Sequence, residues 1–251
     1  MRLDTQGWLV LLEIGLAVPT LLSLIFVPAP YGRHARSGWG PTIPARLGWL
    51  VMESPAVWFF AWVYFQGPNA LSPAPLAFLA MWQLHYLYRA FAFPFLIRAG
   101  GRRMPASVAG MAILFNLLNN WVNARQVSAL GDYPASWLSS PRFLVGCALF
   151  LGGFALNVAS DRALRNLRAP GETGYKIPRG GAFELVTAPN YLGEIVEWTG
   201  WAIATWSPAG LAFAIYTFAN LAPRAITHHR WYRERFPDYP RGRRALLPFL
   251  L

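Results

Sequence analysis

The sequence predicts an all-α integral membrane protein with seven transmembrane helices, its N-terminus outside and its C-terminus in the cytoplasm. The first observation is composition: 55% of the 251 residues are hydrophobic and only 13% are charged, which is too apolar for an ordinary soluble domain. The second is a series of apolar runs that approach the ~20 residues a spanning helix needs. The third is the distribution of basic residues, which alternates between the loops.

Seven apolar runs occupy most of the chain and leave no separate soluble domain, so residues 1–251 are predicted to form a single domain. The head MRLDTQG leads directly into the first run. That run is long for the core of a signal peptide and lacks a clear small-residue cleavage site, so we expect it to remain as a span. The predicted spans are residues 8–27, 47–66, 76–97, 105–122, 141–159, 192–206 and 208–223.

Basic residues gather in alternate loops. The first, third and fifth loops and the C-terminal tail hold 18 of the 22 lysines and arginines, whereas the second and sixth loops hold none. Because basic loops favour the cytoplasmic side of a membrane, this alternation places those loops and the tail inside and fits an odd number of spans. It also explains the net charge of +11 without a nucleic-acid partner.

Proline and glycine mark the joins between spans, as in PAPYGRHARSGWGPTIP (28–44) and QGPNALSPAP (66–75). The cytoplasmic loop at 160–191 is the most informative. Its segment APGETGYKIPRGGAFELVTAPN (169–190) combines turn residues with several aromatic and aliphatic side chains. Loops of this length in a compact protein are usually functional or disordered, and the apolar side chains favour an ordered loop that packs on the protein.

Cysteine and histidine usage excludes several kinds of site. The single cysteine, Cys147, excludes an internal disulfide, an iron–sulfur cluster and a cysteine zinc site. The four histidines lack the spacing of metal ligands, so we expect no metal. Arginine almost entirely replaces lysine, which is typical of a GC-rich bacterial genome. We expect the protein to lie, as a monomer, in a bacterial inner membrane.

Ionisable residues in the first two spans are candidates for function, because charge at membrane depth is rare and usually functional. Glu13 lies near the start of its span, where it could snorkel outward, and we assign it no role. Glu53 closely precedes Pro55, which favours a kink in the second span. Glu53 is a candidate catalytic residue; the alternative is a structural hydrogen bond to a neighbouring helix.

The third span carries His85, Tyr86 and Arg89. The first two each share a helical face with Arg89. A phenol in an apolar cavity is a good hydrogen-bond donor to a carbonyl oxygen, so Tyr86 is a candidate catalytic residue. The alternatives are interfacial packing of Tyr86 and a simple ion pair between Arg89 and Glu53.

Polar stripes with helical spacing mark the cytoplasmic ends of the last three spans. The basic groups of the first stripe could grip phosphates; the alternative is positive-inside topology with an ion pair. Asn190 also suits a helix N-cap and Glu194 suits the helix dipole, whereas the deeper Glu197 either lines a cavity or holds a neighbouring helix. The stripes are Asn157, Asp161, Arg165 and Arg168; Asn190, Glu194 and Glu197; and Arg224, His228 and Tyr232.

The three stripes are predicted to converge on the cytoplasmic side. Their amide, carboxylate, guanidinium, imidazole and phenol groups suit a ribose, phosphates and an amide-bearing ring, which indicates a nucleotide cofactor bound from the cytoplasm. The sequence has no G-x-G-x-x-G that opens a helix after a strand and no Walker motif, so the cofactor would be held without a Rossmann fold. Glu53 and Tyr86 would belong to a second, more apolar pocket.

Several motifs resemble the steroid 5α-reductase family. PYGRH (30–34), PARLGWLVMESPA (44–56) and LHYLYRAF (84–91) carry the resemblance in the N-terminal half. In the C-terminal half it rests on residues 157–207 and on HHRWYRERFPDYPRGRRALLPFLL (228–251). The closing DYP-x-x-R-x-A-L-x-P-F pattern is more specific than PNYLGE, which resembles a motif shared with sterol reductases and isoprenylcysteine methyltransferases.

The resemblance implies a seven-helix membrane enzyme that uses NADPH to reduce the Δ4 double bond of 3-oxo-Δ4-steroids to 5α-dihydrosteroids. Hydride goes to the β-carbon of the enone and a proton to the α-carbon. By similarity, Tyr86 would donate to the carbonyl oxygen, where negative charge builds, and Glu53 would orient it or share the proton. The cofactor-binding residues implied are Asn157, Asp161, Arg165, Arg168, Tyr175, Asn190, Glu194, Arg224, His228 and Tyr232.

Three alternatives stay open at this point. A reductase of another conjugated enone or enoyl lipid would use the same residues. A membrane methyltransferase dependent on S-adenosylmethionine would suit Glu194 and Glu197, which could face a sulfonium cation, but it would not need several arginines. A transporter or scaffold is disfavoured, because no inverted repeat is evident and the polar stripes crowd one end of the spans.

Overall fold

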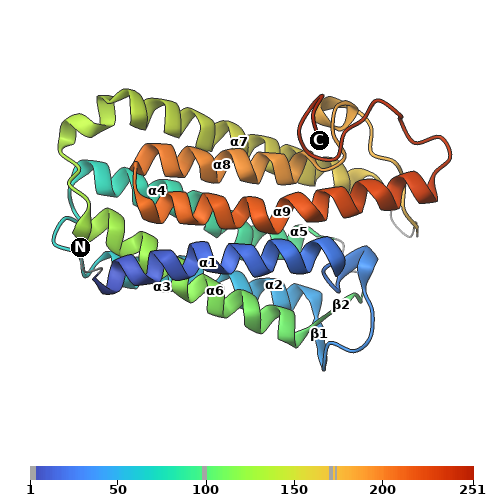
Figure 1. Ribbon diagram of the computed structural model, residues 1–251, viewed down its shortest axis with the longest axis horizontal. Helices are drawn as coiled ribbons and strands as arrows, with labels where there is room; N and C mark the ends of the chain where they lie inside the picture. Colours follow the sequence, from blue (N-terminus) through green and yellow to red (C-terminus); the bar gives the residue numbers. More distant parts are fainter. Residues whose placement is uncertain (1–3, 98–100, 170–171, 173) are drawn as a thin grey trace.

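The computed structural model describes residues 4–97, 101–169, 172 and 174–251, and it shows a bundle of long helices (Figure 1). The chain is mostly helical, which confirms the all-α class. Arg98 of the third loop lies outside the described residues. The α-helices are α1 (Thr5–Phe26), α2 (Ala45–Glu53), α3 (Pro55–Tyr64), α4 (Pro73–Leu87), α5 (Phe93–Leu96), α6 (Ala106–Arg125), α7 (Pro141–Asn166), α8 (Pro189–Thr205) and α9 (Pro208–Arg235).

Short elements join the helices. Strands β1 (Thr42–Pro44) and β2 (Arg103–Pro105) pair antiparallel, with Ile43 opposite Met104, and so connect the first loop to the third. The remaining short elements are 3₁₀ turns at Gly32–His34, Ala135–Ser139 and Gly181–Glu184 and π-helical turns at Tyr88–Ala92 and Gln126–Leu130.

Capping side chains and prolines set where the helices begin. Asp4, Ser140 and Ser207 each accept a hydrogen bond from the backbone N–H three residues on, at 2.8, 3.2 and 3.0 Å, which satisfies a donor that the helix itself leaves open. Proline is the first residue of α3, α4, α7, α8 and α9, where its missing N–H costs nothing.

The apolar runs lie on helices, and the departures have local causes. The second run divides into α2 and α3 at Pro55, whose ring removes the N–H that would continue the helix. The third run contains the π-helical turn Tyr88–Ala92 between α4 and α5. By length and composition, α1 and α7 are the helices within the described residues that could cross a membrane. Glu13, which could have extended outward from its span, instead has a fully buried side chain.

Helices α7 and α8 approach through their backbones. A Cβ added to Gly153 would lie 2.4 Å from the Glu197 nitrogen, and one added to Gly193 would lie 2.6 Å from the Asn157 nitrogen. Small residues allow this close packing between apolar helices. The contact sets the polar stripes of the two helices opposite each other.

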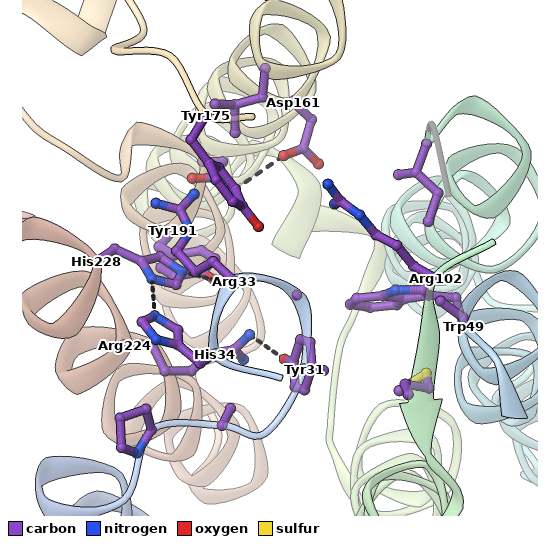
Figure 2. Close-up of a pocket in the computed structure, with 18 of the residues that line it drawn as sticks. Tyr31, Arg33, His34, Trp49, Arg102, Asp161, Tyr175, Tyr191, Arg224 and His228 are labelled. Carbon is purple, nitrogen blue, oxygen red and sulfur yellow. Dashed lines mark hydrogen bonds between the residues drawn. The ribbon is translucent and has the colours of Figure 1, made fainter. Parts of the chain in front are cut away.

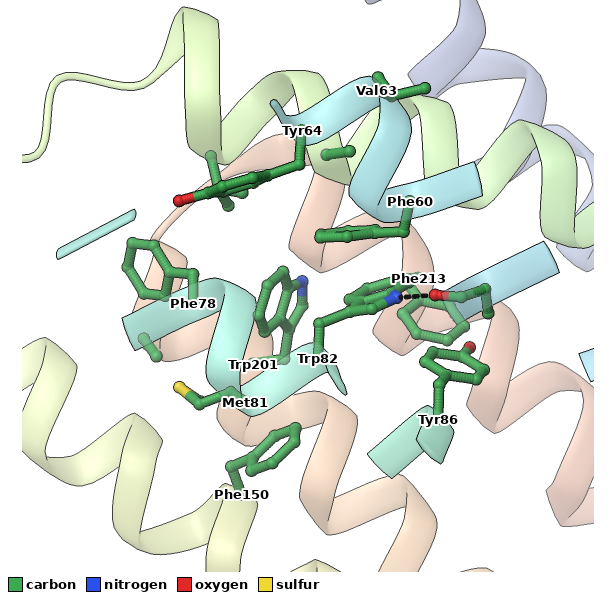
Figure 3. Packing of buried hydrophobic residues seen from close by; sticks show 14 of the residues in the cluster. Phe60, Val63, Tyr64, Phe78, Met81, Trp82, Tyr86, Phe150, Trp201 and Phe213 are labelled. Carbon is green, nitrogen blue, oxygen red and sulfur yellow. Dashed lines mark hydrogen bonds between the residues drawn. The ribbon is translucent and has the colours of Figure 1, made fainter. Parts of the chain in front are cut away.

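Aromatic side chains fill the centre of the bundle (Figure 3). The Trp82 ring lies 4.3 Å from Phe60 and 5.1 Å from both Tyr86 and Trp201, between ring centroids. The Trp82 Nε1 donates a hydrogen bond to the Ala56 carbonyl at 3.0 Å, which joins α4 to α3. This core therefore positions the end of α4 that carries Tyr86.

The C-terminal segment folds back onto the loop before α8 (Figure 1). The backbone N–H groups of Thr187 and Ala188 donate to the carbonyls of Arg244 and Ala245, at 2.8 and 3.2 Å. These bonds fix the place at which α8 begins, and with it the start of the second polar stripe.

Candidate functional site

A cavity of about 300 Å³ lies where α7 ends and α8 begins (Figure 2). Its walls come from the first loop, α2, β2, α7, the loop before α8, α8 and α9. Most of the predicted cofactor residues line it, since α7 and α9 continue as regular helix beyond the predicted spans. The lining members are Asp161, Arg165, Arg168, Tyr175, Asn190, Arg224 and His228.

Asn157 and Glu194 lie behind this wall and support it. The Asn157 Nδ2 donates to the Asn190 carbonyl at 2.9 Å and to Glu194 Oε2 at 3.4 Å. The Asn190 Nδ2 in turn donates to Asp161 Oδ1 at 3.1 Å. Asn190 is not the N-cap of α8, because that position is held by Ala188. Its side chain therefore serves the cavity, where Asp161 holds it, while Asn157 fixes the Asn190 backbone.

Arginines give the cavity a positive charge. Asp161 is the one carboxylate among the described lining residues. In Figure 2 the Arg102 side chain extends across the cavity toward Asp161. Clustered guanidinium groups of this kind bind phosphate well. The lining arginines are Arg33, Arg102, Arg103, Arg165, Arg168 and Arg224.

The first loop forms a wall of the cavity, although none of its residues was among the predicted site residues. The Arg224 guanidinium donates to the Tyr31 hydroxyl. The Nε2 of His34 lies 3.1 Å from the Nδ1 of His228, with the two rings stacked. His228 continues through its Nε2 to the Tyr191 hydroxyl at 3.1 Å. The PYGRH motif contains Tyr31 and His34, and it was the feature of the sequence that could have predicted this wall.

Arg33 lies over three aromatic rings. Its guanidinium carbon is 5.3 Å from the Tyr175 centroid, 5.0 Å from Trp231 and 4.8 Å from Tyr232, which are cation–π distances. The Arg33 Nη1 is buried and has no hydrogen-bond partner among the described residues. Tyr232 therefore contributes to the cavity through Arg33 and not by lining it.

Burial keeps the two stacked histidines neutral. It lowers the pKa of His34 below the usual 6.5, and Arg33, Arg224 and Arg36 lower that pKa further. Burial also lowers the pKa of His228 well below 6.5, with added effects from Arg33, Arg224 and His34. Near pH 7 both imidazoles are uncharged, so one ring donates a hydrogen bond to the other.

Arg89 connects the cavity to the predicted catalytic residues. Its Nε lies 3.9 Å from Glu53 Oε1, and its Nη1 lies 3.7 Å from Asp161 Oδ2. The guanidinium also packs on Trp49 and Phe93, at 4.6 and 4.4 Å from the ring centroids. The ion pair with Glu53 that the sequence left as an alternative is present, and Asp161 extends it to the cavity wall.

Packing positions Tyr86. Within the described residues its hydroxyl makes no hydrogen bond, although only 4% of the residue is exposed. Its ring lies 5.1 Å from Trp82 and 5.6 Å from Trp198, and it interacts electrostatically with Glu53. The phenol O–H is therefore available to a ligand beside Glu53.

Glu197 lies away from the cavity wall and contacts His85. The Nδ1 of His85 is 2.9 Å from Oε1 of Glu197, and the two side chains are 3% and 0% exposed. The sequence left two roles open for Glu197, lining a cavity or holding a neighbouring helix. The contact corresponds to the second role, because it joins α8 to α4.

The residues of the cavity fit a nucleotide cofactor. Asp161 Oδ2 and Arg33 Nη1 are buried polar atoms without a hydrogen-bond partner among the described residues. One is an acceptor and the other a donor, which suits a ligand that carries both hydroxyl and phosphate groups. The arginines would hold phosphates, Asp161 and Asn190 a ribose or carboxamide, and Tyr175 a flat ring.

Fold and cavity together define a helical-bundle protein in which the described residues form two membrane-length helices and an arginine-lined cavity at one end. The family model for 3-oxo-5-alpha-steroid 4-dehydrogenase matches residues 102–251, and the chain belongs to this family, as its motifs predict.

Curated relatives match along nearly the whole chain. The chain is 47% identical over 247 residues to 3-oxo-5-alpha-steroid 4-dehydrogenase 1 of Bos taurus, covering 96% of this chain and 95% of that protein. It is 45% identical over 240 residues to steroid 5-alpha-reductase DET2 of Gossypium hirsutum, covering 94% and 93%. The Homo sapiens 3-oxo-5-alpha-steroid 4-dehydrogenase 1 is 46% identical over 222 residues, covering 88% and 85%.

Proposed function

We propose that the protein is an NADPH-dependent steroid 5α-reductase that converts 3-oxo-Δ4-steroids to 5α-dihydrosteroids. The names of the curated relatives support this activity. The observation that carries the proposal is the Arg89 bridge, which contacts Glu53 at one end and Asp161 of the cavity wall at the other. A cofactor in the cavity would thus lie one side chain away from the groups that polarise the substrate.

Tyr86 and Glu53 perform the chemistry that the chain itself contributes. NADPH, when bound, supplies the hydride that reaches the β-carbon of the enone. Negative charge then builds on the 3-oxo oxygen, where the Tyr86 hydroxyl donates a hydrogen bond. Glu53 orients the phenol or shares its proton, and a proton reaches the α-carbon. Arg89 holds Glu53 in place by its charge.

The cofactor-binding residues divide into those that touch the cofactor and those that act behind them. We assign the 2′-phosphate to Arg168, which packs beside Tyr175 at 5.9 Å and donates to the Gly174 carbonyl at 3.0 Å. Asn157 and Glu194 act through Asn190, and Tyr232 acts through Arg33.

We further propose seven spans in a bacterial inner membrane, with the N-terminus outside and the cavity open to the cytoplasm. Large apolar side chains on the bundle surface support this, such as Trp8, Trp58 and Leu144, which are 62%, 57% and 55% exposed. Such exposure suits lipid contact. An apolar steroid would then reach Tyr86 from the lipid phase.

Purified protein in detergent, given NADPH and a 3-oxo-Δ4-steroid, tests the proposal. We expect loss of the cofactor absorbance band and a 5α-dihydro product by chromatography. NADPH consumption with another enone or enoyl lipid, and none with the steroid, would replace the proposed substrate. Failure to bind NADPH would refute the proposal.

Tyr86→Phe tests the role of the phenol. Turnover should fall by roughly 10²–10³, the usual effect of removing one donor to a developing oxyanion. NADPH affinity should stay the same, because Tyr86 does not line the cavity. Unchanged turnover would reject the assignment.

A further inference from the structure

The buried pair of His85 and Glu197 joins α4 to α8, and the proposed reaction does not use it. Its two atoms are 2.9 Å apart, and both side chains are almost fully buried. Glu197 Oε2 has no hydrogen-bond partner among the described residues, so His85 is what compensates the burial of this carboxyl group. Ionisable pairs in an apolar interior are often no more stabilising than apolar side chains of the same size. The pair therefore suggests a role beyond stability.

The pair lies directly beside the catalytic phenol. The His85 ring is 4.8 Å from the Tyr86 ring and 4.8 Å from Trp198. Trp198 is in turn 5.6 Å from Tyr86, and Trp82 packs on Tyr86 from the core (Figure 3). Because the phenol makes no hydrogen bond within the described residues, these three rings determine the direction of its O–H.

Glu197 helps to fix two of those rings, His85 and Trp198. It bonds His85 directly, and it precedes Trp198 in α8. Its backbone is fixed in turn, because Gly153 of α7 packs against it with no room for a Cβ. The α4 backbone holds Tyr86 less firmly than a regular helix would, because a π-helical turn begins at Tyr88 and interrupts the regular hydrogen bonding.

We propose that His85 and Glu197 are positioning residues for the Tyr86 phenol. Glu197 accepts a hydrogen bond from the Nδ1–H of His85 and locks the imidazole, and the imidazole with Trp198 holds the phenol in the direction in which it donates to the substrate carbonyl. The inference rests on the proposed function, because it concerns the same donor.

Glu197→Gln keeps the size of the side chain and replaces the carboxyl group with an amide, which can either accept a hydrogen bond from the His85 Nδ1 or donate one to it. We expect kcat to fall about 10- to 100-fold, the effect of a small misplacement of a reacting group, while the NADPH Kd stays unchanged. Glu13→Gln is the matched control, because Glu13 is also 0% exposed but lies on α1, outside the site. Its kcat should equal that of the unmodified protein. Full kcat in Glu197→Gln would overturn the inference.

A double variant tests whether the pair acts through the phenol. If it does, Glu197→Gln combined with Tyr86→Phe should be no slower than Tyr86→Phe alone, because residues that act as a unit are not additive. Losses that multiply would overturn the inference.

Nitrogen NMR of histidine-labelled protein gives a readout without turnover. The chain has four histidines, and the signal lost in His85→Asn identifies His85. We expect the Nδ1–H tautomer in the unmodified protein and a mixture of tautomers in Glu197→Gln. If the protein shows the Nδ1–H signal but does not oxidise NADPH, the pairing of His85 with Glu197 is supported and the proposed function is refuted. An active protein whose His85 carries its hydrogen on Nε2 would overturn the pairing.

Discussion

Replacing Gly153 with alanine is expected to push α7 away from α8. The new Cβ would lie 2.4 Å from the Glu197 nitrogen and 2.5 Å from the Gly193 oxygen. Both are backbone atoms, so neither can rotate out of the way. Because real Cβ contacts seldom fall below 3.4 Å, the helices have to separate by about 1 Å at this point, a strain typical of overpacked cores.

The separation breaks the support of the cavity. The Asn157 to Asn190 hydrogen bond of 2.9 Å would lengthen to roughly 3.9 Å, which is beyond hydrogen-bond range. A lost buried hydrogen bond costs about 1 kcal/mol, and overpacking costs about 1–3 kcal/mol. The free energy of unfolding should therefore fall by about 2–4 kcal/mol. Displacement of the Asn190 backbone should raise the NADPH Kd about tenfold, the equivalent of ~1.4 kcal/mol.

Thermal unfolding in detergent and an NADPH titration measure the two effects. Gly152→Ala is the matched control, because it adds the same methyl group one residue earlier, where nothing lies within 4 Å. Alanine also favours a helix more than glycine does, so this control should be at least as stable as the unmodified protein. A Gly153→Ala variant with unchanged Tm and NADPH Kd would refute the packing argument.

Three further changes test separate parts of the site. Arg168→Ala should raise the KM for NADPH more than the KM for NADH in steady-state assays, and equal increases would remove Arg168 from the 2′-phosphate. Lowering the pH below about 6.5 should lower the Tm, because His34 and His228 have lowered pKa values in the folded protein and the unfolded chain therefore binds protons first. Above that pH these two groups should not affect the Tm. His34→Asn should reduce the slope of Tm against pH. Arg89→Gln should cost about 1–3 kcal/mol in a denaturation curve, since it leaves buried carboxyl groups without their cation, and should lower kcat; an unchanged kcat would contradict its bridging role.

Helical periodicity made much of the cavity predictable. Asp161, Arg165, Asn190 and His228 lie on single faces of helices at the cavity end of the bundle, so spacing along the sequence translates directly into position around the site. The same reasoning fails for Arg33 in the first loop. An irregular segment has no fixed period, and the place where it lies is set by the rings it packs on.

Pairing between helices was the part that spacing could not supply. The sequence indicated that Glu197 lies deep, because it follows Asn190 and Glu194 on one face of its helix. It did not indicate His85 as the partner, because that contact depends on the angle at which α4 crosses α8. The glycines of α7 and α8 and the hydrogen bond from Trp82 of α4 to Ala56 of α3 fix how these helices pack, and the spacing within one helix does not reveal such contacts between helices.

The partners of the carboxylates distinguish the reductase from the methyltransferase alternative. The methyltransferase alternative needs Glu194 and Glu197 to face a sulfonium cation, but neither is among the described lining residues: Glu197 is bonded to His85, and Glu194 accepts a hydrogen bond from Asn157. Asp161, which does line the cavity, is bonded to Asn190 and lies 3.7 Å from Arg89. The described lining residues meanwhile include several arginines against a single carboxylate. The arginines would repel a cationic ligand in the cavity and attract one that carries phosphate groups. The charge of the cavity thus favours a dinucleotide over S-adenosylmethionine, whichever enone the protein reduces.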